Sequence, residues 1–188
     1  MRLLYLGSYQ ERFNKIASEV GFGESVLELC FGDLYLFENY LKTKNIKYLG
    51  FDINPNFISH AEKKKANVIL ADIMIEPFPI VDTVIMQSSM YQFINDDEKL
   101  LKRMFEAARK KVIVAEPVRN LAQSKNKIIS FLAKNFVNAG TGQNGLRYEK
   151  ESFFLLFDKF IKDNFELIDS FKYQEIKGGR EIIAVIKK

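Results

Sequence analysis

Polar side chains stand at or near the ends of five short apolar segments of the chain. They are Glu28 in SVLELC, Asp52 in KYLGFD, Asp72 in NVILAD, Gln87 in DTVIMQ and Glu116 in KVIVAEP. If these segments are parallel strands, their carboxyl ends meet at one edge of the sheet, where open α/β sheets bind ligands. Four of the five groups are acids. The spacing therefore predicts an acidic rim suited to a ligand with hydrogen-bond donors or positive charge.

Apolar patterning and capping residues predict the elements that carry this rim. Ser8 to Glu11 has the spacing of a capping box, Asp33 offers an N-cap, Asn54-Pro55 caps and opens a helix, and Asn95 caps another. The predicted helices span residues 8–21, 34–43, 55–65, 96–110 and 149–163, the fourth ending at the basic pair Arg109-Lys110. The predicted strands span residues 25–30, 47–52, 67–72, 82–87, 111–117, 166–173 and 180–188.

The alternation of strands and helices indicates the fold class. Right-handed βαβ units build a parallel sheet covered by helices on both faces. The last two strands have no helix between them, so we expect them to pair antiparallel. The prediction is an α/β three-layer sandwich with a mostly parallel seven-stranded sheet, formed by residues 1–188 as a single domain. Residues 118–150 form an insertion after the fifth strand.

Composition narrows the classes of protein. The 188 residues are 47% hydrophobic and 28% charged, as in an ordinary globular domain. One cysteine and one histidine exclude a disulfide framework, a cysteine-built zinc site and a histidine-rich metal centre. No apolar run approaches the roughly 20 residues of a membrane helix, and MRLLYLG lacks the features of a signal peptide. The scattered lysines do not form a nucleic-acid stripe. We expect a cytoplasmic protein, with no prediction of its oligomeric state.

The turn after the first strand narrows the ligand. Asp52 follows Gly32 by twenty residues, where a carboxylate accepts from both hydroxyls of a ribose. Dinucleotide folds place G-x-G-x-x-G in this turn, whereas here Cys30 and Leu34 flank the single Gly32. We expect the two larger side chains to crowd a pyrophosphate and Asp33 to repel it. A cationic ligand with a ribose and no phosphate, such as S-adenosylmethionine, fits better.

Four segments together resemble a known family. VLELCFGD (26–33), GFDINP (50–55), ADIMIEPFP (71–79) and DTVIMQSSMYQF (82–93) are similar, in order and spacing, to motifs of the class I S-adenosylmethionine-dependent methyltransferases. The resemblance covers residues 8–188. The sequence departs from the family where Cys30 and Leu34 replace two of the three glycines in the first motif.

The resemblance implies roles for the residues of the first two motifs. Glu28 would accept from the methionine ammonium, directly or through water. Gly32 would let the backbone approach the cofactor, with Cys30 beside it in the same turn. Asp52 would bind the ribose diol, and Ile53 would pack on the adenine.

The later motifs carry further implied roles. Asp72 would accept from the adenine amino group, and Ile73 would supply a backbone contact. Gln87 would lie beneath the sulfonium, with Tyr91 near the methyl group. Arg12 is interpreted either as a partner of the cofactor carboxylate or as a surface arginine.

Methyl transfer from a sulfonium is an in-line displacement in which the protein mainly aligns the reactants and excludes water. Glu116 is a candidate base, with a structural acid before Pro117 as the alternative, and Tyr148 could orient an acceptor. Residues 118–150 either fold over the crevice as a lid or complete the core. Gln87 to Met90 differs from the Asn/Asp-Pro-Pro-Tyr tetrapeptide of base amino methylases, which argues against methylation of base amino groups and leaves ribose and carbon targets open. The predicted partner is a small-molecule O or N acceptor.

Two other classes stay open. A nicotinamide-dependent oxidoreductase is opposed by the glycine-poor turn after the first strand. A non-catalytic binding or regulatory protein could use the same fold with a degenerate cofactor site.

Overall fold

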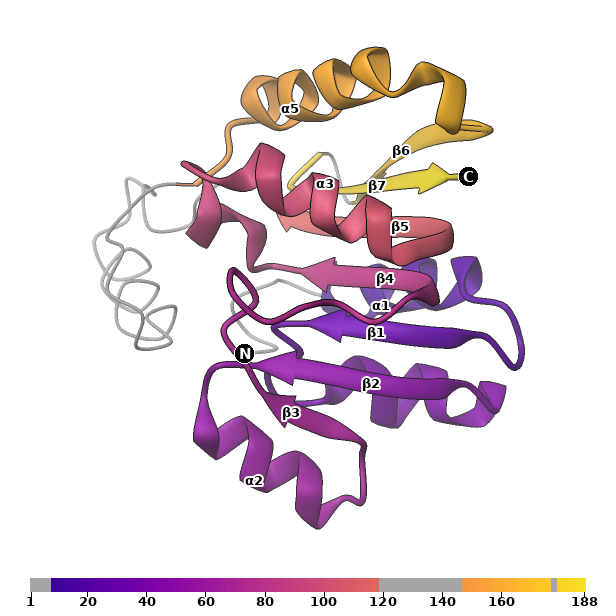
Figure 1. Cartoon of the computed structure of the whole chain (residues 1–188), viewed down its shortest axis with the longest axis vertical. Helices are drawn as coiled ribbons and strands as arrows, with labels where there is room; N and C mark the ends of the chain where they lie inside the picture. Colours follow the sequence, from indigo (N-terminus) through magenta and orange to yellow (C-terminus); the bar gives the residue numbers. More distant parts are fainter. Residues whose placement is uncertain (1–7, 119–146, 177–178) are drawn as a thin grey trace.

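The computed structural model describes residues 8–118, 147–176 and 179–188, and in them a seven-stranded sheet forms the centre of the molecule (Figure 1). Its strands are β1 (Ser25–Leu29), β2 (Lys47–Asp52), β3 (Val68–Leu70), β4 (Val81–Gln87), β5 (Ala108–Pro117), β6 (Ser170–Ile176) and β7 (Glu181–Lys187). The strand order is β3-β2-β1-β4-β5-β7-β6. Strands β1 to β5 are parallel, and β7 pairs antiparallel with both β5 and β6. The predicted mixed sheet is confirmed.

Helices cover both faces of the sheet, as Figure 1 shows with α3 in front of it and α1 behind. The helices are α1 (Ser8–Glu19), α2 (Pro55–Lys63), α3 (Asp97–Ala107) and α5 (Lys150–Asp163), with short turns η1 (Phe37–Leu41), η2 (Lys42–Lys44), η3 (Met90–Phe93) and η5 (Phe165–Leu167). No helix of the described residues is long and apolar enough to cross a membrane. The predicted three-layer sandwich is confirmed.

Alternating side chains of β5 show how the layers are held together. Val112 and Val114 pack in the cluster that includes α3 and α5, whereas Ile113 and Ala115 pack in the cluster that includes α1. All four are at most 1% exposed. Successive side chains of a strand point to opposite faces, so one apolar run fills both interfaces. Burial of each valine or isoleucine stabilises the fold by roughly 1.5–3 kcal/mol.

The prediction that Arg109 and Lys110 end a helix is wrong. Helix α3 begins after Asp96 rather than Asn95 and ends at Ala107, and β5 begins at Ala108. The two basic side chains lie on the exposed start of β5, both within 4.0 Å of Asp82 on the neighbouring strand β4. Ion pairs between neighbouring strands, rather than a helix dipole, accommodate these charges.

The segment after Asp33 also differs from its predicted helix. It forms the π-type turn η1 and the 3-10 turn η2, and Asp33 accepts a hydrogen bond from the backbone N–H of Tyr35 at 3.2 Å. Aromatic packing accompanies this irregular backbone, with the Phe37 ring 4.1 Å from that of Tyr48.

Toward the C-terminus, residues 166–169 precede β6 and are not part of it, contrary to the predicted strand. Of the predicted insertion 118–150, residues 119–146 lie outside the described residues, so the lid stays a prediction.

Candidate functional site

The turn after β1 keeps the backbone of a glycine-rich loop although it holds only one glycine. Cys30, Gly32 and Leu34 have φ values of 53°, 63° and 63°, in the left-handed region that favours glycine. These are the three positions that glycines occupy in the motif that the turn resembles. Each non-glycine residue here costs roughly 1–2 kcal/mol of backbone strain. The surrounding structure therefore imposes this loop shape.

The expectation that the Leu34 side chain crowds the ligand beside the turn is wrong. This side chain is fully buried in a small core with Phe31, Tyr48 and Ile58, so it packs away from the edge that we expected it to crowd. Cys30 is partly exposed, and its backbone N–H donates to the Phe51 carbonyl at 2.7 Å. The loop thus differs from a glycine-rich loop in one side chain that faces the edge.

Asp52 lies across this loop at the end of β2. The Gly32 N–H donates to its Oδ2 at 3.0 Å, and the Asn54 N–H donates to its Oδ1 at 2.9 Å. Burial raises the pKa of Asp52, against the effect of these hydrogen bonds. Each oxygen keeps a further lone pair. At Gly32 an added Cβ would meet nothing within 4 Å, so open space lies beside the loop.

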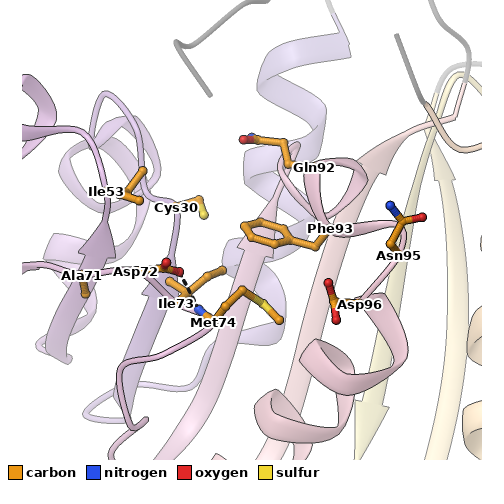
Figure 2. Close-up of a pocket in the computed structure, with 10 residues that line it drawn as sticks. All are labelled: Cys30, Ile53, Ala71, Asp72, Ile73, Met74, Gln92, Phe93, Asn95 and Asp96. Atoms are coloured by element: carbon orange, nitrogen blue, oxygen red, sulfur yellow. Dashed lines mark hydrogen bonds between the residues drawn. The ribbon is translucent and has the colours of Figure 1, made fainter. Parts of the chain in front are cut away.

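A pocket of about 270 Å³ lies at this edge. Its lining residues come from the β1 turn, the segments after β2 and β3, and η3 with the residues after it: Cys30, Ile53, Ala71, Asp72, Ile73, Met74, Gln92, Phe93, Asn95 and Asp96. Figure 2 shows Ile53 and Cys30 on one side, Phe93 on the other, and Asp72 with Ile73 between them. Ile53 is 52% exposed, which is unusual for isoleucine. The pocket offers apolar side chains on two sides and two carboxylates, Asp72 and Asp96.

The structure brings half of the predicted ligand residues into the lining of this pocket, and the other half, Glu28, Gly32, Asp52 and Gln87, are not part of that lining. Cys30, Ile53, Asp72 and Ile73 all line it. Asp72 is exposed, and its Oδ1 accepts from the Met74 N–H at 2.9 Å. The predicted motif 82–93 includes Gln92 and Phe93 of this lining, whereas sequence reasoning missed Asn95 and Asp96. The only signal for these two residues was that they follow β4, where ligand crevices lie.

Glu28 is enclosed rather than open. Its oxygens accept from Tyr48 Oη at 2.8 Å and from Gln87 Nε2 at 2.7 Å, and the side chain is completely buried. Burial raises its pKa to about 7, against these two hydrogen bonds. Glu28, Asp52 and Asp72 therefore all accept hydrogen bonds from within the chain. Among the described residues, Gln87 Oε1 is buried without a hydrogen-bond partner.

Glu116 lies near the carboxyl end of β5. In the strand order, β5 and the β2 strand that carries Asp52 lie on opposite sides of β1, which leads into Cys30. Glu116 is fully buried, the Met90 N–H donates to its Oε1, and within the described chain its Oε2 has no partner. Burial raises its pKa to about 7, and the positive charge of Arg147 opposes this. Arg147 stacks over the Tyr91 ring at 3.3 Å from the centroid. The two predicted catalytic residues, Tyr91 and Glu116, thus both lie near Arg147.

Two other predicted residues have structural partners. Tyr148 is buried and its hydroxyl donates to Asp97 at 2.6 Å, so this hydroxyl is tied to the start of α3. Arg12 is 3% exposed and is not a surface arginine. It donates to Ser88 Oγ and lies 3.6 Å from Glu181. Sequence reasoning missed Glu181, which reaches this edge because β7 is antiparallel and begins opposite Pro117.

Comparisons with known proteins agree with this fold. No protein-family model matches the sequence, and no curated protein resembles it closely enough to count as a match. Magnesium protoporphyrin IX methyltransferase (ChlM) from Synechocystis PCC 6803, solved with SAH, has a TM-score of 0.67 and 13% identity over 96% of this chain and 84% of that one. The methyltransferase domain of bacterial CtHen1 has a TM-score of 0.71 and 15% identity over 97% and 100%.

The likeness extends beyond proteins described as methyltransferases. A Rhodobacter sphaeroides protein described as a candidate zinc-dependent alcohol dehydrogenase has a TM-score of 0.69 and 13% identity, over 95% of this chain and 90% of that one. At such identities a likeness establishes the fold alone. The chain has the class I methyltransferase fold, as its motifs predicted.

Proposed function

We propose that this protein is an S-adenosylmethionine-dependent methyltransferase that transfers a methyl group in line to an O or N atom of a small molecule. One observation carries the proposal. The left-handed turn at Cys30, Gly32 and Leu34 is held against Asp52, beside a pocket with apolar walls. A similar fold, that of ChlM, has been solved with SAM and with SAH.

The residues at the edge fit this cofactor. Asp52, oriented by two backbone donors, would accept from the ribose hydroxyls. Ile53 and Phe93 would cover the adenine faces, Asp72 would accept from its amino group, and Ile73 would supply a backbone contact. Open space at Gly32 allows close approach to the backbone. The acidic edge suits a sulfonium and disfavours a pyrophosphate.

Gln87 and Glu28 would face the methionine end. Each oxygen of Glu28 accepts one hydrogen bond and keeps a further lone pair, so Glu28 would accept from the ammonium directly or through a water. The buried Gln87 Oε1, which has no partner in the described residues, would accept from the ligand or from that water.

When bound, the sulfonium supplies a methyl group on a good leaving group. The chain's own residues would then align the acceptor, exclude water and take up a proton. Glu116 supports the last role, because a pKa of about 7 lets a buried carboxylate accept a proton near neutral pH. Tyr91, whose ring is fixed by Arg147, would orient the acceptor.

Calorimetry with SAH and with NAD tests the proposal. We expect SAH to bind and NAD to give no heat of binding. Binding of NAD alone would indicate an oxidoreductase. If neither ligand binds to folded protein, the chain is a non-catalytic binding or regulatory protein, an alternative favoured by the non-glycine residues in the turn. Release of SAH from SAM, scored over a panel of amines and alcohols, then identifies the acceptor class.

A further inference from the structure

We infer that Cys30 determines the cofactor affinity of this site, because its side chain occupies pocket space that a glycine would leave open. This inference rests on the proposed function. It assigns the departure from the glycine-rich motif to a single side chain, and it predicts that a smaller residue at position 30 tightens cofactor binding.

The geometry of the turn distinguishes Cys30 from Leu34, the two residues that replace glycines of the motif. Leu34 has the same left-handed backbone as Cys30, but its side chain is 0% exposed and packs with Phe31, Tyr48 and Ile58. Cys30 is partly exposed and lines the pocket with Ile53 and Asp72. Figure 2 shows its thiol on the same side of the pocket as Ile53. Only one of the two replaced glycines therefore changes the pocket wall.

The chemistry of the site indicates that Cys30 acts through its volume. Burial, together with the negative charges of Asp52, Glu116 and Asp72, raises the pKa of its thiol. The thiol therefore stays neutral and is a poor nucleophile at physiological pH. It adds a Cβ and a sulfur atom to the wall of the pocket.

The size of the pocket makes two heavy atoms important. Its volume is about 270 Å³. Pockets for ligands of drug size usually hold about 300–1,000 Å³. Because the volume of this pocket lies just below that range, removal of the thiol should change affinity measurably. Differences of one methylene in a tight pocket change discrimination by roughly tenfold or more.

Backbone strain at Cys30 is a separate effect with its own readout. The left-handed φ of 53° is unfavourable for any residue with a Cβ, so Cys30→Gly relieves strain and Cys30→Ala does not. Strain that persists in both the free and the bound protein cancels in the binding free energy. The melting temperature therefore measures the backbone strain at position 30, and the SAH affinity measures the pocket space that its side chain occupies.

The experiment compares the wild type with Cys30→Gly and Cys30→Ala by calorimetry with SAH, and uses Leu34→Met as the matched control in the same turn. We expect SAH to bind at least about fivefold more tightly to the glycine and alanine variants. Leu34→Met should leave the SAH affinity unchanged, because Leu34 packs in the core. The melting temperature should rise in the glycine variant and not in the alanine variant.

Each outcome decides the inference. If the wild type binds SAH and neither Cys30 variant binds it more tightly, the inference is wrong and the proposed function stands. If only the Cys30 variants bind SAH, the inference is supported, and the wild-type site is too narrow for the proposed function. If no variant binds SAH while all remain folded, both are refuted.

Discussion

Asp52 offers the sharpest test of the proposed cofactor site. Replacement by alanine removes the carboxylate that would accept from the ribose, and Asp52→Asn keeps the size but replaces one oxygen with a donor. In the asparagine variant, the new NH₂ group must face either the Gly32 N–H or the Asn54 N–H, because each now donates to one Asp52 oxygen. The NH₂ group would then face a backbone N–H, and two hydrogen-bond donors repel each other. We therefore expect both Asp52→Ala and Asp52→Asn to weaken SAH binding.

The magnitude follows from the number of hydrogen bonds. A hydrogen bond to a charged group contributes about 1.5–3 kcal/mol. Loss of one such bond to the ribose lowers SAH affinity by roughly 10- to 150-fold, and loss of both lowers it further. The same carboxylate also fixes the glycine turn, so we expect a separate loss of about 1–3 kcal/mol in the free energy of unfolding.

Calorimetry with SAH measures the first effect and urea denaturation the second. Asp82→Asn is the matched control, because Asp82 accepts from the backbone N–H and the hydroxyl of Ser25, both at 2.9 Å, at the opposite edge of the sheet. It should lose stability and keep SAH affinity. Folded Asp52→Ala protein with an SAH affinity within about twofold of the wild type would refute the ribose assignment.

Two further predictions concern buried charge. Burial raises the pKa of both Glu28 and Glu116 from 4.5 to about 7, so their contribution to stability is greatest below pH 4.5 and is lost as the pH rises toward 7. Ionisation of each glutamate should lower the free energy of unfolding by on the order of 3 kcal/mol between pH 4.5 and 8. Urea titrations across this pH range should therefore show a smaller decline in stability for Glu28→Gln than for the wild type. An equal decline in the two proteins would contradict this prediction. Arg12→Met leaves Glu181 buried without its cation and should cost about 3–5 kcal/mol in urea denaturation, most of which an added Glu181→Gln should restore. A loss below about 1 kcal/mol would show that this ion pair is not important for stability.

The sheet and its polar edge could be predicted because their signals are local. Strand β2 has the predicted bounds, since a buried apolar run ends at Asp52 and the Asn54-Pro55 cap follows directly. Asn54 accepts from the Asn56 N–H at 2.9 Å, as an N-cap should. Such patterns depend on few residues outside the segment itself.

The rest depends on contacts between distant segments. Arg109 and Lys110 resemble a helix end in sequence, but they lie in a strand because Ala108 and Lys111 on either side of them pair with β4. Leu34 resembles an obstruction beside the ligand, whereas the core against β2 and α2 takes up its side chain. Glu28 resembles an open acid, and only the fold brings Tyr48 and Gln87 to it. Patterns within a single segment of the sequence could not predict these contacts, because the partners lie far apart along the chain.

The place of β7 in the sheet has a consequence for folding during synthesis. Strand β7 lies between β5 and β6, so both of those strands present unpaired edges until β7 has left the ribosome. Because β7 supplies Glu181, the ion pair between Arg12 and Glu181 forms only after that strand has been made. The sheet therefore stays open beside β5 until β7 has been synthesised. Unpaired strand edges favour aggregation, so we expect this interval to be one in which the chain is prone to aggregate.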